Sequence, residues 1–360
     1  MTATAHDTAP TGERSAGAMR FGTVCLWRSD SVAYGREVEL ADELGFDMIC
    51  GGDSQSVYRE VYVGLAVAAM RTRGALLGPM VTNPITRHPA VTASAIATID
   101  ELSGGRAILG IGTGDSAIRN LGEKAATLAA LREYVVALRG LLRGETVGWR
   151  GRAIHTSWVR RAVPIYISAE GPRTLELAGA VADGVVMHTG TTPEIVADSI
   201  AHVRRGAEAA GRDPDTIDIW AMLKGNVADT RQQAIDEIKM GLAGSAHHAF
   251  RLGLEGKHVP ERLQGPVLDL VHRYDTRAHE VWDGANASIS DELGITEYLA
   301  DRFALVGTPD ECIARVAALR DAGLRQLIVP ALGPDPLRVL RRFGEEVFPR
   351  FREASVAARV

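Results

Sequence analysis

Acidic and imidazole side chains follow several of the apolar runs in this sequence. Asp53 comes after "CGG", Asp115 after "GIGTG" and His188 after "GVVM". If these runs are parallel strands, their carboxyl ends meet at one edge, where α/β proteins bind ligands. Asp53 could orient the polar edge of a ligand there or cap the next helix, and His188 could be a base or a structural side chain. The residues alone leave both pairs of interpretations open.

The segment "GGRAILGIGTGDSA" (104–117) holds five glycines beside Asp115. A dinucleotide fingerprint needs G-x-G-x-x-G between a strand and a helix, with an acidic residue about 20 positions later. Here the spacing is Gly110-x-Gly112-x-Gly114, so the third glycine comes one position early. We therefore reject Rossmann-type dinucleotide binding. We expect instead a strand end whose backbone is open to a flat ligand, with Asp115 directed toward it.

Two further strand ends have backbone features suited to a ligand. Pro79 interrupts the apolar run 74–83, and because proline cannot donate to a sheet ladder, this strand must bulge or break. The bulge would bring the backbone near Thr82 and Asn83 toward the strand ends. The segment "SAEGP" ends at Pro172, a favourable first helical residue, and the free N–H groups of a helix N-terminus bind phosphate.

Eight alternations of a short apolar run with a longer segment of helical period must position these residues. The runs are nearly continuous, as expected for strands that helices bury on both faces. Eight such units predict an α/β protein with a (β/α)8 TIM barrel, although a doubly wound sheet shares the local pattern. The expected strands are 19–26, 47–52, 74–83, 106–113, 164–169, 183–190, 217–228 and 325–332, and the expected helices are 34–46, 57–72, 89–103, 123–144, 172–182, 193–211, 231–243 and 336–351.

The alternation predicts one barrel domain over residues 19–352, preceded by a disordered tail at 1–18. The tail lacks the apolar segment of a signal peptide. Two segments break the alternation and predict insertions after strands 4 and 7. Residues 145–163 are typical of a hairpin or loop. Residues 244–300 predict a mostly helical insertion over the barrel mouth, which builds a substrate pocket, or else a packing extension or oligomer contact.

Composition excludes several classes of function. The net charge is -5 with basic residues scattered along the chain, which argues against nucleic-acid binding. No apolar run reaches the roughly 18 residues of a membrane span. The cysteines, Cys25, Cys50 and Cys312, predict buried thiols in a cytoplasmic protein. The sequence contains no zinc-binding spacing, nucleophile elbow or Walker loop, and we expect no metal site.

Three blocks of the sequence resemble the bacterial luciferase-like superfamily, in particular its deazaflavin-dependent branch, which includes methylenetetrahydromethanopterin reductases. The resemblance runs over about residues 19–350. It is weak in 244–300. The blocks are "TNPITRHPAVTASAIATIDELSGGRAILGIGTGDSA", "PIYISAEGPRTLELAGAVADGVV" and "FALVGTPDECIARVAALRDAGLRQLIVP".

The resemblance implies a (β/α)8 barrel with coenzyme F420 or FMN at the strand carboxyl ends. It also implies a bulged third strand with a non-prolyl cis peptide beneath the ring, by position between Met80 and Val81. Asp115 matches a position proposed as a proton donor in related dehydrogenases, a role that needs burial to raise its pKa toward neutrality. The residues expected to contact the cofactor are Asp53, Met80, Val81, Thr82, Asn83, Gly112, Thr113, Gly114, Ala169, Glu170, Gly171 and His188.

The sequence departs from the related sugar-phosphate dehydrogenases at three places. Ser54 stands where they have a histidine after the second strand, and "MHTGTTPE" lacks their phosphate-binding lysine. A hydroxyl cannot act as the base for alcohol oxidation at neutral pH, so sugar-phosphate oxidation is not expected. Glu170 stands where they have glycine, and it should point away from phosphate or pair with Arg173.

These observations predict an oxidoreductase that moves hydride between reduced F420 and an unsaturated C=N, C=C or C=O group of a small molecule. One alternative is an FMN-dependent monooxygenase that uses O2 and reduced flavin from a partner flavin reductase. A second is a barrel that binds flavin without catalysis. We expect a homodimer, as is common in the family, with no nucleic-acid or membrane partner.

Overall fold

The computed structural model describes residues 18–28, 30–159, 161–279 and 281–352. Of the tail expected at 1–18, all but Ala18 lies outside these described residues, and the division of the chain into domains stays a prediction. Within the described residues no helix has both the length and the apolarity that crossing a membrane requires.

Eight parallel strands form the barrel expected from the sequence. Their order around the sheet is β3-β2-β1-β12-β9-β8-β7-β4. Bridges from Leu77 to Ala107 and from Thr82 to Ile111 bring β3 beside β4 and nearly close the barrel. The strands are β1 (Arg20–Val24), β2 (Met48–Gly51), β3 (Leu76–Pro79), β4 (Leu109–Ile111), β7 (Ile165–Ala169), β8 (Gly184–Met187), β9 (Asp218–Met222) and β12 (Gln326–Ile328).

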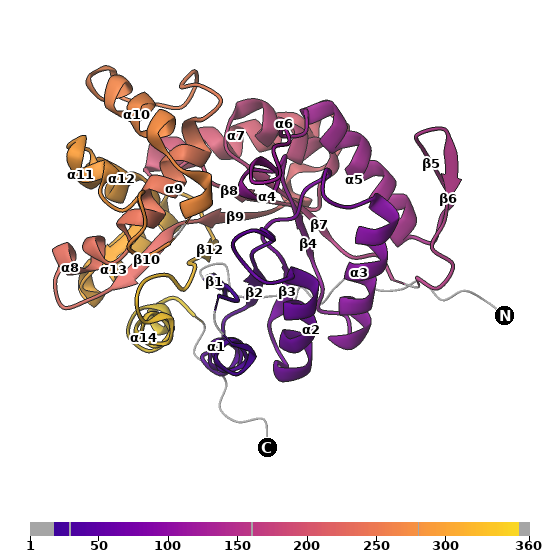
Figure 1. The fold of residues 1–360 in the computed structure, drawn as a ribbon, viewed down its shortest axis with the longest axis horizontal. Coiled ribbons are helices and arrows are strands. Elements are labelled where there is room, and N and C mark those ends of the chain that lie inside the picture. The colour runs from indigo at the N-terminus through magenta and orange to yellow at the C-terminus, as the bar shows by residue number, and fades with distance from the viewer. Residues whose placement is uncertain (1–17, 29, 160, 280, 353–360) are drawn as a thin grey trace.

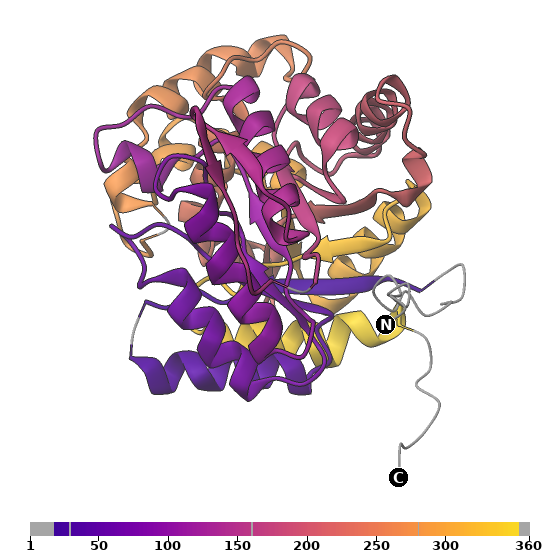
Figure 2. The same cartoon turned by 90° about the vertical axis from the view of Figure 1, so that its right-hand side faces the viewer.

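Helices lie around the barrel, so that each strand is buried on both sides. The described ends of the chain meet, because β1 pairs with β12 and α1 contacts α14, as Figures 1 and 2 show. The stacked rings of Phe21 and Phe348, 3.7 Å apart, pack beneath this junction. The surrounding helices are α1 (Ser31–Glu43), α2 (Val61–Arg71), α3 (Pro89–Leu102), α5 (Leu128–Leu142), α6 (Pro172–Val181), α7 (Pro193–Ala209), α13 (Pro309–Asp321) and α14 (Pro336–Arg341).

The segment between β9 and β12 differs from the sequence expectation. The run 217–228 is two strands rather than one: β9 stays in the barrel, and β10 (Lys224–Val227) pairs outside it with β11 (Ala304–Gly307). The expected helix 231–243 is interrupted and becomes α8 (Arg231–Asp236) and α9 (Lys239–Phe250). An apolar run reveals a strand but not its pairing partner, so the sequence alone could not show where the chain leaves the barrel.

Helices α8 to α12 pack around a hydrophobic core of their own, on one side of the barrel in Figure 1. Phe250, Leu299 and Phe303 belong to this core. The hairpin of β5 (Val147–Trp149) and β6 (Arg152–Ile154) lies on the opposite side in that view. The remaining helices here are α10 (Glu261–Arg273), α11 (Ile289–Glu292) and α12 (Thr296–Phe303), and α4 (Ser116–Arg119) follows β4.

Candidate active site

A cavity of about 930 Å³ lies at the carboxyl ends of the barrel strands. Its walls come from the segments after β2, β3, β4, β7 and β8 and from helix α9. All the candidate residues named from the sequence line it except Thr82 and Ala169, which are fully buried. Tyr58, Lys224 and Lys257 also line the cavity, and none of them was expected from the sequence.

The segment after β3 crosses toward β4 and forms one wall of the cavity. The peptide bond between Met80 and Val81 is cis, as the resemblance implied. Thr82 continues the sheet, because its N–H donates to the Gly110 carbonyl at 3.0 Å and its carbonyl accepts from Gly112 N–H at 2.9 Å. The backbone of Thr82 therefore positions the wall while its side chain stays outside the cavity.

Glycine in β4 permits this close approach. A Cβ atom on Gly110 would lie 2.3 Å from the Pro79 carbonyl oxygen, and one on Gly112 would lie 3.1 Å from Val81. Gly114 has φ of +95°, a conformation that favours glycine. The glycine spacing thus lets two backbones meet and leaves an open face toward the cavity.

Asn83 and Asp53 are held by neighbouring groups beside this wall. Asn83 lines the cavity, and its Oδ1 accepts from the backbone N–H groups of residues 85 and 86, while its buried Nδ2 has no protein partner in the described chain. Asp53 does not cap α2, whose N-cap is Glu60. Instead its carboxylate pairs with Arg87 at 2.5 Å.

The N-terminus of α6 forms another part of the wall. Gly171 is its N-cap and provides no side-chain hydrogen bond, and Pro172, Arg173 and Thr174 also line the cavity. The Lys257 side chain reaches the N-terminus of α6, because a Cβ atom added to Gly171 would lie 3.4 Å from Lys257 Cε. Open N–H groups beside a cation are suited to a phosphate.

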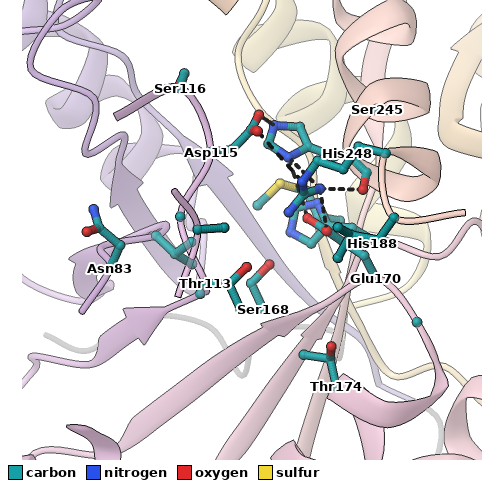
Figure 3. A pocket seen from close by; sticks show the side chains of 18 of the residues that line it. Asn83, Thr113, Asp115, Ser116, Ser168, Glu170, Thr174, His188, Ser245 and His248 are labelled. Carbon is teal, nitrogen blue, oxygen red and sulfur yellow. Dashed lines mark hydrogen bonds and ion pairs between the residues drawn. The ribbon is translucent and has the colours of Figure 1, made fainter. Parts of the chain in front are cut away.

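A cluster of charged and imidazole side chains joins the strand ends to α9, as Figure 3 shows. Asp115 Oδ1 lies 2.8 Å from Arg119 Nε, 3.5 Å from His247 Nε2 and 3.6 Å from Arg251 Nε. Asp115 Oδ2 lies 3.5 Å from His248 Nε2. Asp115 is therefore surrounded by cations and imidazoles.

The condition for Asp115 to act as an acid is not met. Burial alone would raise its pKa, but His248, His247 and Arg251 together outweigh burial and hold the pKa well below its usual range. An ionised carboxylate cannot donate a proton. The acidic role implied by the resemblance thus lacks support from the surroundings of Asp115.

Glu170 pairs with a residue other than the expected one. Its partner is Arg251 of α9, at 2.5 Å, and not Arg173. Burial would raise the pKa of Glu170, but Arg251 and His248 lower it to about 2. The carboxylate is therefore neutralised by Arg251 of α9.

His188 and Ser54 complete the group of candidates. Burial lowers the pKa of His188 to about 4, despite the opposing charge of Glu170, so this ring is neutral at pH 7. Ser54 Oγ is hydrogen-bonded to Ser116 Oγ at 2.9 Å. Neither side chain is therefore suited to act as the base that removes a proton from an alcohol.

The α9 residues of the cluster were missed from the sequence. Ser245, His248, Arg251 and Leu252 line the cavity at spacings of three and four, which is one face of a helix. That spacing was available in "SAHHAFRL", but nothing in the sequence indicated where this segment lies relative to the barrel. His247 lies beside this face, with its ring stacked on Tyr274.

Comparisons with known proteins agree with this architecture. The luciferase-like monooxygenase family model matches residues 19–326. A 5,10-methylenetetrahydromethanopterin reductase of Methanolobus tindarius is 33% identical over 91% of this chain and 99% of its own. An F420-dependent glucose-6-phosphate dehydrogenase of Nakamurella multipartita is 31% identical over 87% of this chain and 90% of its own.

Solved structures give the same result. The coenzyme F420 dependent tetrahydromethanopterin reductase from Methanopyrus kandleri superposes with a TM-score of 0.76 at 27% identity, covering 93% of this chain and all of that one. A Streptomyces bottropensis monooxygenase, at 23% identity and a TM-score of 0.65, shares the fold. The chain belongs to the luciferase-like monooxygenase family and is an oxidoreductase of that family.

Proposed function

We propose that this enzyme transfers hydride between coenzyme F420 and an unsaturated C=N, C=C or C=O group of a small molecule. The observation that carries the proposal is the open glycine wall of β4 beside the Met80–Val81 peptide, in a cavity large enough for a flat ring and a substrate. Two relatives that cover about nine-tenths of the chain, a dehydrogenase and a reductase, are named as F420-dependent enzymes.

The residues present fit a deazaflavin with a phosphate-bearing side chain. Gly112 and Val81 offer a flat backbone surface for the ring, and the unpaired Asn83 Nδ2 is a donor for a polar ring edge. The N-terminus of α6 and Lys257 suit the phosphate. Arg87 neutralises Asp53 nearby, so that a carboxylate at this edge does not repel the cofactor.

When bound, the deazaflavin would supply two electrons and a hydrogen as hydride. The protein would hold the ring against the wall of β3 and β4, exclude water with α9, and stabilise the charge that develops on the substrate heteroatom. Sugar-phosphate oxidation is disfavoured, because Ser54 is a hydroxyl bonded to Ser116 and His188 has a low pKa.

Cofactor titrations test this proposal. F420 and FMN are added separately to the purified protein, and their fluorescence is followed. Anaerobic single turnovers then pair reduced F420 with 5,10-methylenetetrahydromethanopterin, 1-pyrroline or 2-cyclohexen-1-one, and oxidised F420 with glucose 6-phosphate. We expect tight binding of F420 and oxidation of reduced F420 by one of the first three compounds.

Two results would overturn the proposal. Binding of FMN alone, with O2-dependent turnover, would favour the monooxygenase function. Tight F420 binding without turnover of any compound would favour a binding protein.

A further inference from the structure

We propose that His248 of α9, and not Asp115, is the catalytic residue that gives the substrate its proton, with Asp115 and Glu170 as positioning residues that hold the imidazole ring at the cavity. This inference rests on the proposed function and deepens it. It assigns the acid to the helix that packs over the strand ends rather than to the strand end itself.

His248 is more accessible than Asp115, although both line the cavity. The His248 side chain is 25% exposed, whereas that of Asp115 is 6% exposed. Figure 3 shows His248 between Asp115 and Glu170. A substrate in the cavity therefore meets the imidazole more readily than the carboxylate.

Two carboxylates flank the His248 ring. His248 Nε2 lies 3.5 Å from Asp115 Oδ2, and its Nδ1 lies 3.5 Å from Glu170 Oε1. These contacts hold the ring between the strand ends of β4 and β7. The distance from Nε2 to Asp115 exceeds an ordinary hydrogen bond, so Nε2 is open to a substrate.

Two other side chains contact the ring. Arg251 Nη1 lies 3.4 Å from His248 Nδ1, and His279 packs with its ring centre 5.4 Å away. Arg251 is itself paired with Glu170. The groups facing His248 from every neighbouring element are Asp115 after β4, Glu170 after β7, His188 after β8, His247 and Arg251 on α9, and His279 after η2 (Thr276–Ala278).

The step balances as follows. Hydride bonds to the carbon of a C=N or C=O group, the π bond breaks, and its electron pair moves to the heteroatom. Nε2–H of His248 transfers its proton to that heteroatom, and the ring is left neutral until solvent at the cavity mouth reprotonates it. The substrate gains two electrons and two hydrogens: a bound deazaflavin would supply the hydride, and His248 supplies the proton.

Imidazole NMR of the protein without cofactor tests the position of the ring directly. Histidine is labelled with 15N, and His248→Gln assigns the His248 signals. We expect the His248 signals to move in both Asp115→Asn and Glu170→Gln, because each carboxylate lies 3.5 Å from one ring nitrogen. Unchanged His248 signals in both variants would overturn the inference.

Single turnover tests the role of the proton. The measurement uses reduced F420 and whichever compound the wild type reduces fastest. We expect His248→Gln to slow hydride transfer by about 100-fold or more while F420 affinity stays unchanged. Added imidazole should partly restore the rate of His248→Ala, which a structural role would not allow. The exposed His272→Gln on α10 is the matched control, with a wild-type rate.

The outcomes separate this inference from the proposed function. The inference fails and the proposed function survives if the wild type reduces a substrate and His248→Gln transfers hydride at a rate within twofold of the wild type. The same holds if His248→Gln no longer binds F420. If the wild type binds no F420, both fail.

Discussion

At the scale of single residues, the pair of Glu170 and Arg251 holds two charges in the wall of the cavity. Removing the carboxylate leaves the Arg251 guanidinium, which is 5% exposed, with the Asp115 carboxylate at 3.6 Å and the backbone carbonyl of His248 as partners. Isolating a buried charge typically costs 3–5 kcal/mol. We expect a smaller cost here because Asp115 remains.

We predict that Glu170→Gln lowers the free energy of unfolding at pH 7 by about 2 kcal/mol, measured by urea denaturation. The pKa of Glu170 is about 2 in the folded protein, against 4.5 ordinarily. The stabilisation is therefore present above pH 4.5 and lost as the pH falls toward 2. Glu208→Gln, on the exposed face of α7, is the control. Equal stability of wild type and Glu170→Gln at pH 7 would contradict this prediction.

His188 also makes the fold less stable as the pH falls, but over a higher range of pH. Its pKa is about 4 in the folded protein, against 6.5 ordinarily, so the unfolded chain binds an extra proton between these values. Stability should fall as the pH falls from 6.5 to 4. We expect the free energy of unfolding to fall by about 2 kcal/mol less on acidification in His188→Gln than in the wild type. The difference is smaller than the full pKa shift would give, because the ring is partly exposed. Unfolding curves at pH 7 and pH 4.5 measure it, and an unchanged difference between the two would refute it.

At the scale of elements, the approach of β3 to β4 depends on glycine. A Cβ on Gly110 would lie 2.3 Å from a backbone oxygen that cannot move independently. We predict that Gly110→Ala lowers the free energy of unfolding by about 2 kcal/mol, the usual scale of overpacking, and weakens F420 binding at least tenfold.

The matched control is Gly148→Ala in the β5–β6 hairpin, where a Cβ meets nothing within 4 Å. It should change the stability by less than about 0.5 kcal/mol and leave F420 affinity unaltered. Unfolding and cofactor fluorescence are measured on both variants. A Gly110→Ala protein that behaves like Gly148→Ala would show that β3 and β4 do not need this contact.

The strands themselves could be predicted because burial on both faces produces short, nearly continuous apolar runs. All eight barrel strands lie within the runs named from the sequence. The sequence failed at β10 and β11, whose pairing outside the barrel leaves no local signature, and we assigned no element to α13. That helix has a capping box of Thr308 and Glu311, a signal that could have located it.

At the scale of the whole molecule, the site combines a barrel rim with a helix that is distant in sequence. The strand ends supply glycines and carboxylates, which the sequence reveals by their positions after apolar runs. Helix α9 supplies His248 and Arg251, whose contact with Asp115 depends on how the segment after β9 packs. The open wall was therefore predictable from the sequence, while the ionisation of Asp115 was not, because the neighbours that set its pKa come from elsewhere in the fold.

The most direct test of the account is a crystal structure of the protein with F420 bound. The account predicts the deazaflavin ring against Gly112 and the Met80–Val81 peptide, the phosphate at the N-terminus of α6, and His248 facing the open side of the ring. Electron density for the ring at another place would contradict this account. So would a wild-type crystal that contains no cofactor although it was grown at F420 concentrations that saturate binding in solution.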